Sequence, residues 1–153
     1  MKLRMNHQAV NRTAYDTMMA MEQTVSRRFA DKVLYELLKI RVSQINGCAF
    51  CLDMHAKDLM KLGDYSAHIL MLPVWREAPC FSERERVMLE FAEAAARISD
   101  GGIPDELYSR VREFFSEEEY VDLIMAVNTI GSWNRLAIAT GMYPGCFDRT
   151  AAH

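Results

Sequence analysis

The sequence predicts an all-α domain of about seven helices. Apolar residues recur along the chain at the spacing of one helix face, whereas the alternation typical of a half-buried strand is almost missing. Helix-capping patterns and glycine or proline breaks return at intervals that fit helices of ordinary length. Because the sequence contains no repeat, low-complexity tract or linker, residues 1–153 are expected to form a single domain.

Amphipathic stretches predict the first two helices. One covers about residues 12–28, and Asp31 is a suitable N-cap for the next, whose apolar stripe runs through residues 33–45. Asn46 and Gly47 then end this second helix, because both residue types tolerate a positive φ. The chain is therefore expected to turn sharply into whatever follows.

The middle of the chain is predicted to hold a third helix and a broken fourth segment. The third helix covers about residues 48–62 and stops at Gly63. Asp64 is predicted to cap the fourth segment, which is interrupted by Pro73 and ends near Pro79, since proline cannot continue a helix.

Two capping boxes mark the helices of the C-terminal half. Ser82 precedes a fifth helix of about residues 83–98, and Pro104 is well placed to open a short sixth helix. Ser116 precedes a long last helix that is expected to end around Gly141.

Composition and charge exclude two classes of partner. The net charge is −3 and there is no basic cluster, so the chain offers no polycationic surface for nucleic acid. The N-terminal segment lacks the apolar run of a secretory signal, and no stretch approaches the roughly 20 apolar residues of a membrane span. We therefore expect a cytoplasmic protein without membrane contact. In that reducing compartment, its four cysteines argue against a disulfide framework.

A close pair of cysteines followed by a histidine is the strongest functional signal. Cys48, Cys51 and His55 fall in one sector of the predicted third helix, on its inward, apolar side. Two thiols at this spacing can close a disulfide within one turn, and an imidazole can move protons. Glu36, on the preceding helix, either pairs with a lysine at the surface or folds back to orient His55. Such a set suits two-electron thiol redox chemistry.

The residues alone leave open which thiol attacks. Cys48 lies in the first turn of its helix, where unpaired N–H groups and the helix dipole favour a thiolate. Cys51 lies deeper, where burial raises the pKa of a thiol unless a base is near. His55 is expected to stack over Cys51 as that base. Thiol pKa therefore favours Cys48, whereas proton relay favours Cys51.

Zinc binding is the main alternative use of this motif. The ligands would be Glu36, Cys48, Cys51 and His55. Structural zinc sites usually bring a second close cysteine pair, which this sequence lacks. The two remaining cysteines, Cys80 and Cys146, are isolated, and we interpret both as small buried apolar residues.

At these residues the sequence resembles a known family. The segment from Glu36 to His55, with the run RVSQINGCAFC at 41–51, resembles the alkylhydroperoxidase D (AhpD)-like family of the carboxymuconolactone decarboxylase superfamily. The later run NTIGSWNR, followed by GMYP, is similar to small members of the same family. The similarity covers most of the chain. It implies an AhpD-like helical fold that assembles into homo-oligomers, either trimers or hexamers.

The resemblance also implies a thiol-dependent peroxidase that reduces organic hydroperoxides or hydrogen peroxide. Cys51 would be the peroxidatic thiol, and Cys48 would resolve its sulfenic acid as a disulfide. Glu36 and His55 would form the proton relay, and an external dithiol reductant would reset the pair. No cofactor or metal is implied. The best-known peroxidases of the family place a second histidine between the two cysteines, where this chain has Phe50.

Polar residues of the last helix form a second, weaker group of candidates. Asn128, Asn134 and Arg135 either bind substrate or form a buried hydrogen-bond network that holds this helix, and the network is the favoured interpretation. Phe50 and Met54 are expected towards the polar side of the third helix, where apolar groups suit a subunit contact.

Two functions of other classes remain as alternatives to the peroxidase. One is a redox-responsive binding or assembly protein that uses the cysteine pair as a sensor without efficient turnover. The other is a zinc-stabilised helical protein.

Overall fold

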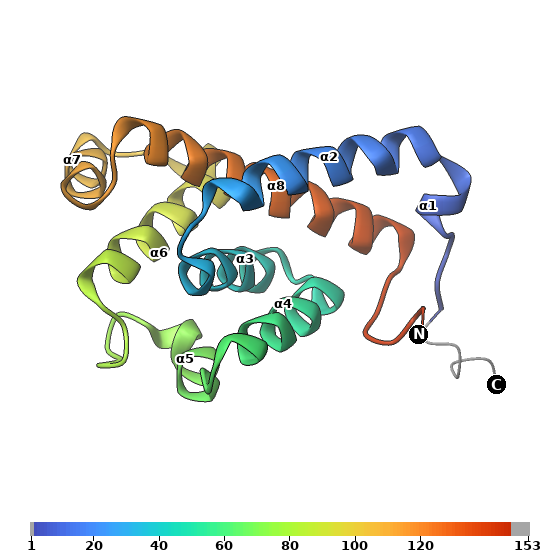
Figure 1. The fold of residues 1–153 in the computed structure, drawn as a ribbon, viewed down its shortest axis with the longest axis horizontal. Coiled ribbons are helices and arrows are strands. Elements are labelled where there is room, and N and C mark those ends of the chain that lie inside the picture. Colours follow the sequence, from blue (N-terminus) through green and yellow to red (C-terminus); the bar gives the residue numbers. More distant parts are fainter. Residues whose placement is uncertain (1, 148–153) are drawn as a thin grey trace.

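The computed structural model describes residues 2–147, and within this range the chain is entirely helical, as predicted (Figure 1). Eight α-helices and two short 3₁₀ segments were found there, and no strand. They are α1 (His7–Val10), α2 (Arg12–Arg28), α3 (Lys32–Asn46), α4 (Ala49–Leu62), α5 (Ser66–Met71), η1 (Leu72–Val74), α6 (Glu83–Ala96), η2 (Ile98–Asp100), α7 (Asp105–Phe114) and α8 (Glu117–Thr140). The sequence did not predict α1, and residue 98 belongs to η2 rather than to the preceding helix.

Most predicted caps are present and explain helix boundaries, but Asp64 is not the N-cap of α5, because that position is taken by Tyr65. The Asp31 side chain accepts a hydrogen bond from the first turn of α3, and Gly47 ends that helix with φ at 71°. Ser82 and Ser116 both form complete capping boxes, at the starts of α6 and α8. Pro73 lies within η1, so the broken fourth segment is a short helix followed by a 3₁₀ turn.

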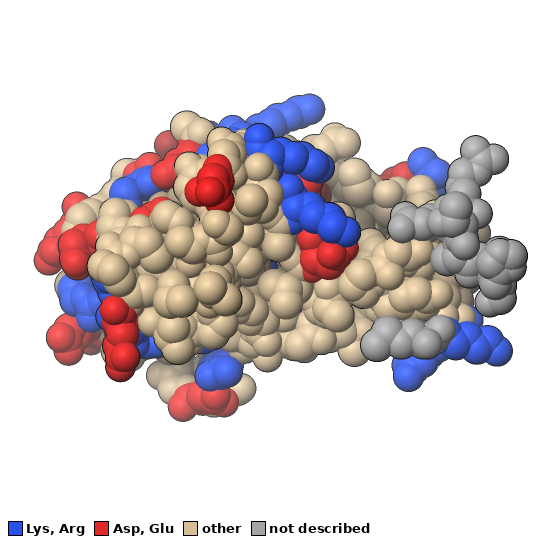
Figure 2. All heavy atoms as spheres, turned by 90° about the horizontal axis from the view of Figure 1, so that it is seen from below, with Lys and Arg blue, Asp and Glu red and all other residues tan. Residues whose placement is uncertain are grey.

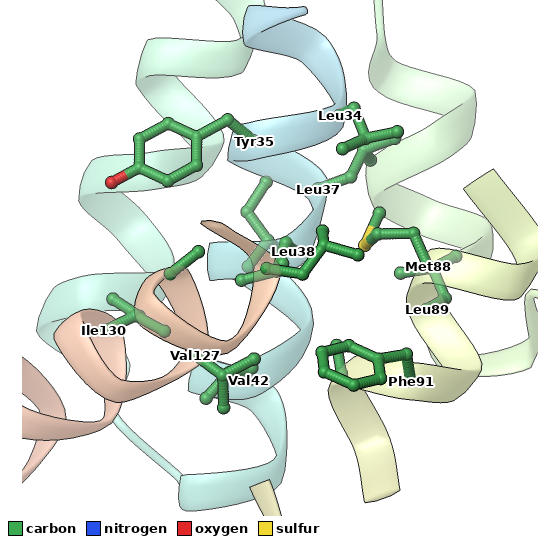
Figure 3. Packing of buried hydrophobic residues seen from close by; sticks show 14 of the residues in the cluster. Leu34, Tyr35, Leu37, Leu38, Val42, Met88, Leu89, Phe91, Val127 and Ile130 are labelled. Carbon is green, nitrogen blue, oxygen red and sulfur yellow. The ribbon is translucent and has the colours of Figure 1, made fainter. Parts of the chain in front are cut away.

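Helix α3 lies at the centre of the fold and contacts α4, α6 and α8 (Figure 1). Its leucines are completely buried, and Figure 3 shows them packed against residues of α6 and α8 such as Met88, Phe91 and Ile130. The α3–α4 turn at Gly47 folds α4 back along α3. The central helix α3, which carries Glu36, therefore lies next to the helix that carries Cys51 and His55.

The N-terminal segment is fastened to the end of α8. The Arg4 backbone N–H donates to the Thr140 carbonyl at 2.9 Å, and its guanidinium donates to the Ala139 carbonyl at 3.1 Å. Gly141 has φ at 74°, and a Cβ there would lie 3.0 Å from the Lys2 carbonyl oxygen, so this close approach requires glycine. These contacts hold α1 beside the C-terminal half of α8.

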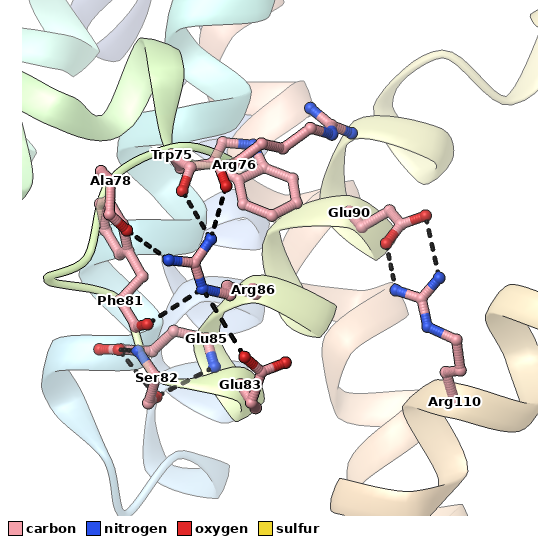
Figure 4. Close-up of polar contacts among 10 residues, drawn as sticks. All are labelled: Trp75, Arg76, Ala78, Phe81, Ser82, Glu83, Glu85, Arg86, Glu90 and Arg110. Atoms are coloured by element: carbon pink, nitrogen blue, oxygen red, sulfur yellow. Dashed lines mark hydrogen bonds and ion pairs between the residues drawn. The ribbon is translucent and has the colours of Figure 1, made fainter.

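A partly buried arginine organises the loop between η1 and α6 (Figure 4). The Arg86 guanidinium donates to the carbonyls of Phe81 at 3.1 Å, Trp75 at 3.0 Å and Arg76 at 2.9 Å, and it also bonds the Ala78 carbonyl. Since a single planar cation satisfies all these backbone acceptors, we interpret this network as structural.

Charge is unevenly distributed over the face shown in Figure 2. Charged side chains gather towards the end of the molecule formed by α6 and α7, and much of the remaining surface is uncharged. Exposed apolar side chains on α4, α5 and η1 include Met60, Leu70 and Val74. They agree with the expectation of a homo-oligomer, which stays a prediction. Within residues 2–147, no helix combines the length and the apolar character needed to cross a membrane.

Candidate redox site at the α3–α4 turn

The two cysteines of the motif lie against each other at the start of α4. Cys48 is the N-cap of this helix, and its Sγ accepts a hydrogen bond from the Cys51 backbone N–H at 3.4 Å. The two Sγ atoms are 2.6 Å apart, both cysteines are free thiols, and each is only 2% exposed. The capping turn therefore sets the spacing that closing a disulfide requires.

The environment separates the pKa values of the two thiols. The hydrogen bond from the Cys51 thiol lowers the pKa of Cys48 to about 7, against the opposing effect of burial. The Asn134 amide and the N–H groups of Cys51 and Phe50 lower it further. The pKa of Cys51 is raised, because its proton is held in the bond to Cys48 and because it is buried. When the pair carries one negative charge, its surroundings therefore favour the thiolate on Cys48 and the remaining proton on Cys51.

His55 and Glu36 are in direct contact. The His55 Nδ1 lies 2.9 Å from the Glu36 Oε2, and His55 is buried one turn after Cys51 on α4. The other oxygen of Glu36 pairs with the Lys39 ammonium at 2.7 Å. Both interpretations of Glu36 thus hold in part: it pairs with a lysine, but it does so beneath the surface, where it also orients the imidazole.

The charges around Glu36 favour its ionised form. Burial raises the pKa of this carboxyl, but the hydrogen bond with His55 and the nearby ammonium of Lys39 lower it more, so the pKa lies below its ordinary value. Lys39 also lies 3.7 Å from the Glu22 Oε1 and 3.9 Å from the centre of the Tyr35 ring. The Tyr35 hydroxyl donates to the same Glu22 oxygen at 3.0 Å. This network of hydrogen bonds and ion pairs therefore continues from α4 through α3 to α2.

The three polar candidates of α8 lie in different environments in the structure. Asn134 is buried, donates to the Ser43 hydroxyl at 3.1 Å and accepts from the Asn46 amide at 2.9 Å. It therefore belongs to a buried network next to Cys48. Asn128 and Arg135 are exposed, and neither is among the described residues that line the cavity beside Cys51.

A cavity of about 380 Å³ opens beside Cys51. Successive turns of three helices form most of its wall, since residues three or four apart share a helix face. The lining side chains are Tyr15, Met19 and Glu22 of α2, Phe50, Cys51, Met54, His55 and Asp58 of α4, and Trp133 and Ala137 of α8, with His7, Gln8, Lys39, Met142 and Phe147. Cys48 is absent from this described lining, so of the two thiols it is Cys51 that faces the cavity.

The arrangement departs from several expectations about neighbouring residues. Phe50 faces the cavity and contacts the Phe147 ring, with ring centroids 6.2 Å apart, so part of its apolar surface is covered within the chain. Met54 is exposed but also lines the cavity. Cys80 and Cys146 are only half-buried, in contrast to the prediction that both are core residues, because they lie in the loops after η1 and α8.

The predicted zinc ligands do not converge on one point. Within residues 2–147, the group whose ligand atoms all lie within 4.8 Å of one another is Glu36, His55 and Asp58, and neither cysteine is part of it. Because a thiol site for zinc needs the sulfurs among its ligands, the geometry favours thiol redox chemistry at Cys48 and Cys51.

Sequence reasoning missed the α1–α2 side of this site. His7, Tyr15 and Glu22 are distant from the cysteines in sequence, and no motif connects them to the cysteine pair. The only local signal is the spacing of Tyr15, Met19 and Glu22, which places them on one face of α2. That spacing does not show what the face contacts.

The fold and the site together define a class: an all-helical protein with a buried Cys-x2-Cys pair at a helix N-terminus, beside a His–Glu pair and a cavity. Comparison with known proteins agrees. The model of the carboxymuconolactone decarboxylase family matches residues 12–94. The chain is also 47% identical over 124 residues to the uncharacterized protein YdfG of Bacillus subtilis, which covers 81% of this chain and 84% of YdfG. The chain belongs to the carboxymuconolactone decarboxylase family.

Other relatives include proteins that carry the AhpD name. A segment of 62 residues, 39% of this chain, is 40% identical to the alkyl hydroperoxide reductase AhpD of Hyphomonas neptunium and covers 34% of it. A solved structure from Agrobacterium tumefaciens, a protein of unknown function for which an AhpD role in antioxidant defence has been suggested, superposes with a TM-score of 0.90. It is 36% identical, and the match covers 94% of this chain and 99% of that one. The prediction of an AhpD-like fold is confirmed.

Proposed function

We propose that this protein is a thiol peroxidase that reduces organic hydroperoxides or hydrogen peroxide through Cys51 and Cys48. One observation carries the proposal. Cys51 and His55 line the same cavity, and the Cys48 Sγ lies 2.6 Å from the Cys51 Sγ without being part of the lining. This arrangement supports roles for Cys51 as the attacking thiol, Cys48 as the resolving thiol and His55 as the proton-handling imidazole. The AhpD names of two relatives agree with this chemistry.

The short contact between the two sulfurs supports a defined first step, in which a proton must move against its resting preference for Cys51. The proton held between the sulfurs moves from Cys51 to Cys48, which leaves a Cys51 thiolate facing the cavity. This thiolate attacks the terminal oxygen of the hydroperoxide, the O–O bond breaks, and Cys51 becomes a sulfenic acid. The alkoxide that leaves takes a proton delivered through His55, which Glu36 orients, and departs as the alcohol.

The second step forms a disulfide between the two cysteines. The Cys48 thiol attacks the Cys51 sulfenic sulfur, a disulfide forms, and the thiol proton leaves with the hydroxyl as water. Two electrons have passed from the two thiols to the peroxide. An external dithiol, as the cytoplasm supplies, then reduces the disulfide through a mixed disulfide. We propose that this cycle runs in a trimer or hexamer of the chain.

A single-turnover experiment tests the proposal. Reduced, metal-stripped protein is mixed with one equivalent of cumene hydroperoxide, peroxide loss is followed, and the cysteines are mapped by mass spectrometry. We expect rapid peroxide loss and a Cys48–Cys51 disulfide. Intact peroxide and reduced thiols after minutes would overturn the peroxidase and favour the sensor or the zinc protein, which zinc analysis and oligomer size on oxidation would separate.

Single variants test the roles of the two thiols. In Cys48→Ser we expect a sulfenic acid on Cys51, trapped by dimedone, that forms more slowly and does not become a disulfide. In Cys51→Ser we expect no sulfenic acid, and Cys80→Ser serves as the matched control with normal turnover. Sulfenic acid on Cys48 in the Cys51 variant would show that Cys48 is the attacking thiol.

A further inference from the structure

Two polar groups of the cavity wall opposite α4 lack partners. Both ring nitrogens of His7 and the Oε2 of Glu22 are buried, and none of them has a hydrogen-bond partner among residues 2–147. Buried polar atoms are normally paired, and leaving one unpaired costs about 1–3 kcal/mol. Both residues line the cavity that Cys51 faces. Their unpaired atoms therefore lie just beneath the cavity wall, where a small displacement of neighbouring side chains would let them bind a molecule inside it.

Both groups are held in place by contacts that do not use these atoms. The N-terminal segment is anchored at the end of α8 through Arg4, and the His7 ring packs against the rings of Tyr15 and Trp133 at centroid distances of 5.8 and 6.4 Å. Glu22 uses its other oxygen, Oε1, for Tyr35 and Lys39. The positions of the free atoms are thus fixed before any ligand binds.

The remaining lining determines which ligand fits. Aromatic and methionine side chains supply an apolar wall, and about 380 Å³ lies towards the lower end of the roughly 300–1,000 Å³ typical of small-molecule pockets. The charged side chains of the lining are Glu22, Asp58 and Lys39. Lys39 is already paired with Glu36 and lies near Glu22, so two carboxylates face the cavity with no uncommitted cation among the lining residues. An anionic ligand would be repelled there.

We propose that His7 and Glu22 are specificity-determining residues that bind a hydroxyl or N–H group on an uncharged, one-ring-sized apolar substrate and reject its carboxylate analogues. The Glu22 Oε2 accepts the hydrogen of this group, and His7 supplies a second hydrogen bond. The inference rests on the proposed function for the identity of the reacting group, but the selectivity belongs to the cavity and does not depend on turnover.

Equilibrium binding of three probes of nearly equal shape tests the proposal. They are 2-phenyl-2-propanol, cumene, which lacks the hydroxyl, and 2-methyl-2-phenylpropanoate, which carries a carboxylate. Binding is followed by the fluorescence of Trp133 in a Trp75→Phe background, with the cysteines reduced. We expect the alcohol to bind at least about tenfold more tightly than either analogue, since one well-made hydrogen bond is worth about that factor.

Variants show whether the two residues are responsible. His7→Phe keeps an aromatic ring but removes both ring nitrogens, and it should reduce the preference for the alcohol over cumene by about threefold or more, since the hydrogen bond to Glu22 remains. Glu22→Gln removes the charge and should improve carboxylate binding by about tenfold, while His68→Phe and Glu77→Gln, whose side chains lie outside the cavity lining, should change nothing. If Glu22→Gln fails to fold, because Tyr35 and Lys39 lose a partner, the His7 variant still decides.

The outcomes separate this inference from the proposed function. Equal binding of the three probes, or an undiminished preference in His7→Phe, would overturn the inference even if cumene hydroperoxide is reduced rapidly, and would leave water as the partner of these atoms. Selective binding by a protein that does not consume peroxide would support the specificity residues and overturn the peroxidase.

Discussion

The hydrogen bond between the two thiols should control the charge state of Cys48. Its removal in Cys51→Ala takes away the largest influence that lowers the pKa of Cys48 to about 7 from 9.0. We expect the pKa to rise by about one unit or more. The rise is limited because the N–H bonds of the helix N-terminus and the Asn134 amide remain, and both still lower the pKa. Cys51→Ser is the matched control, since its hydroxyl can still donate to Cys48 and should keep part of the effect.

The magnitude follows from the fraction of thiolate. At pH 7 a thiol with a pKa of about 7 is about half ionised, whereas one with a pKa of about 8 is only about one tenth ionised. The rate of Cys48 alkylation by iodoacetamide at pH 7 should therefore fall about fivefold or more in Cys51→Ala. The rate should recover as the pH is raised through 8 and 9, because only the thiolate reacts.

The assay measures Cys48 modification by mass spectrometry at a series of pH values. Cys80 and Cys146 in the same protein serve as internal references for reagent reactivity. An unchanged midpoint near pH 7 in Cys51→Ala would refute the reasoning, since it would show that the helix N-terminus alone stabilises the thiolate and that the bond between the sulfurs contributes nothing.

Three further predictions concern stability, each measured by urea unfolding. The pKa of Glu36 is lowered in the folded protein, so its ionised form contributes stability that is present above its ordinary pKa of 4.5 and is lost as the pH falls through the lowered value. Glu36→Gln should therefore lose less stability below that pH, and an equal dependence of the unfolding free energy on pH in both proteins would contradict this. Asn134→Ala should cost about 1–3 kcal/mol, because it leaves the buried Ser43 hydroxyl without this partner, while the exposed neighbour Arg135→Ala should cost less than about 0.5 kcal/mol. Leu38→Ala, at a completely buried position, should cost about 2–5 kcal/mol, and a comparable loss in the 71%-exposed Leu70→Ala would show that burial does not decide the cost.

Local chemistry made the helices predictable from the sequence. An N-cap, a capping box or a positive-φ glycine acts within a few residues, so Asp31, Gly47, Ser82 and Ser116 carry the same information in the sequence as in the fold. The same holds for the cysteine motif, whose three residues share one face of one helix. The short α1 is different, because its position depends on contacts with the distant end of α8.

The candidate site was predictable only as far as it is local. The contact between Glu36 and His55 depends on how α4 folds back on α3, and the sequence left two interpretations open because nothing local decides between a surface pair and a buried one. The cavity was out of reach, since its wall combines helices whose contacts are long-range. A face of α2 can be recognised by its spacing, but its partner follows only from the packing of the whole core.

The question of which thiol attacks changes form once the geometry is known. From the sequence alone, thiol acidity favours Cys48 as the attacking residue, whereas proton relay favours Cys51. In the structure these properties belong to different sulfurs: Cys48, at the helix N-terminus, stabilises negative charge, and Cys51 faces the cavity. A shared proton connects the two over 2.6 Å, so the acidity of one can be passed to the other when a substrate arrives. Acidity at Cys48 is thus compatible with attack by Cys51, provided that the hydrogen bond between the sulfurs is intact. Cys51→Ala and Cys48→Ser test this condition by removing one sulfur each.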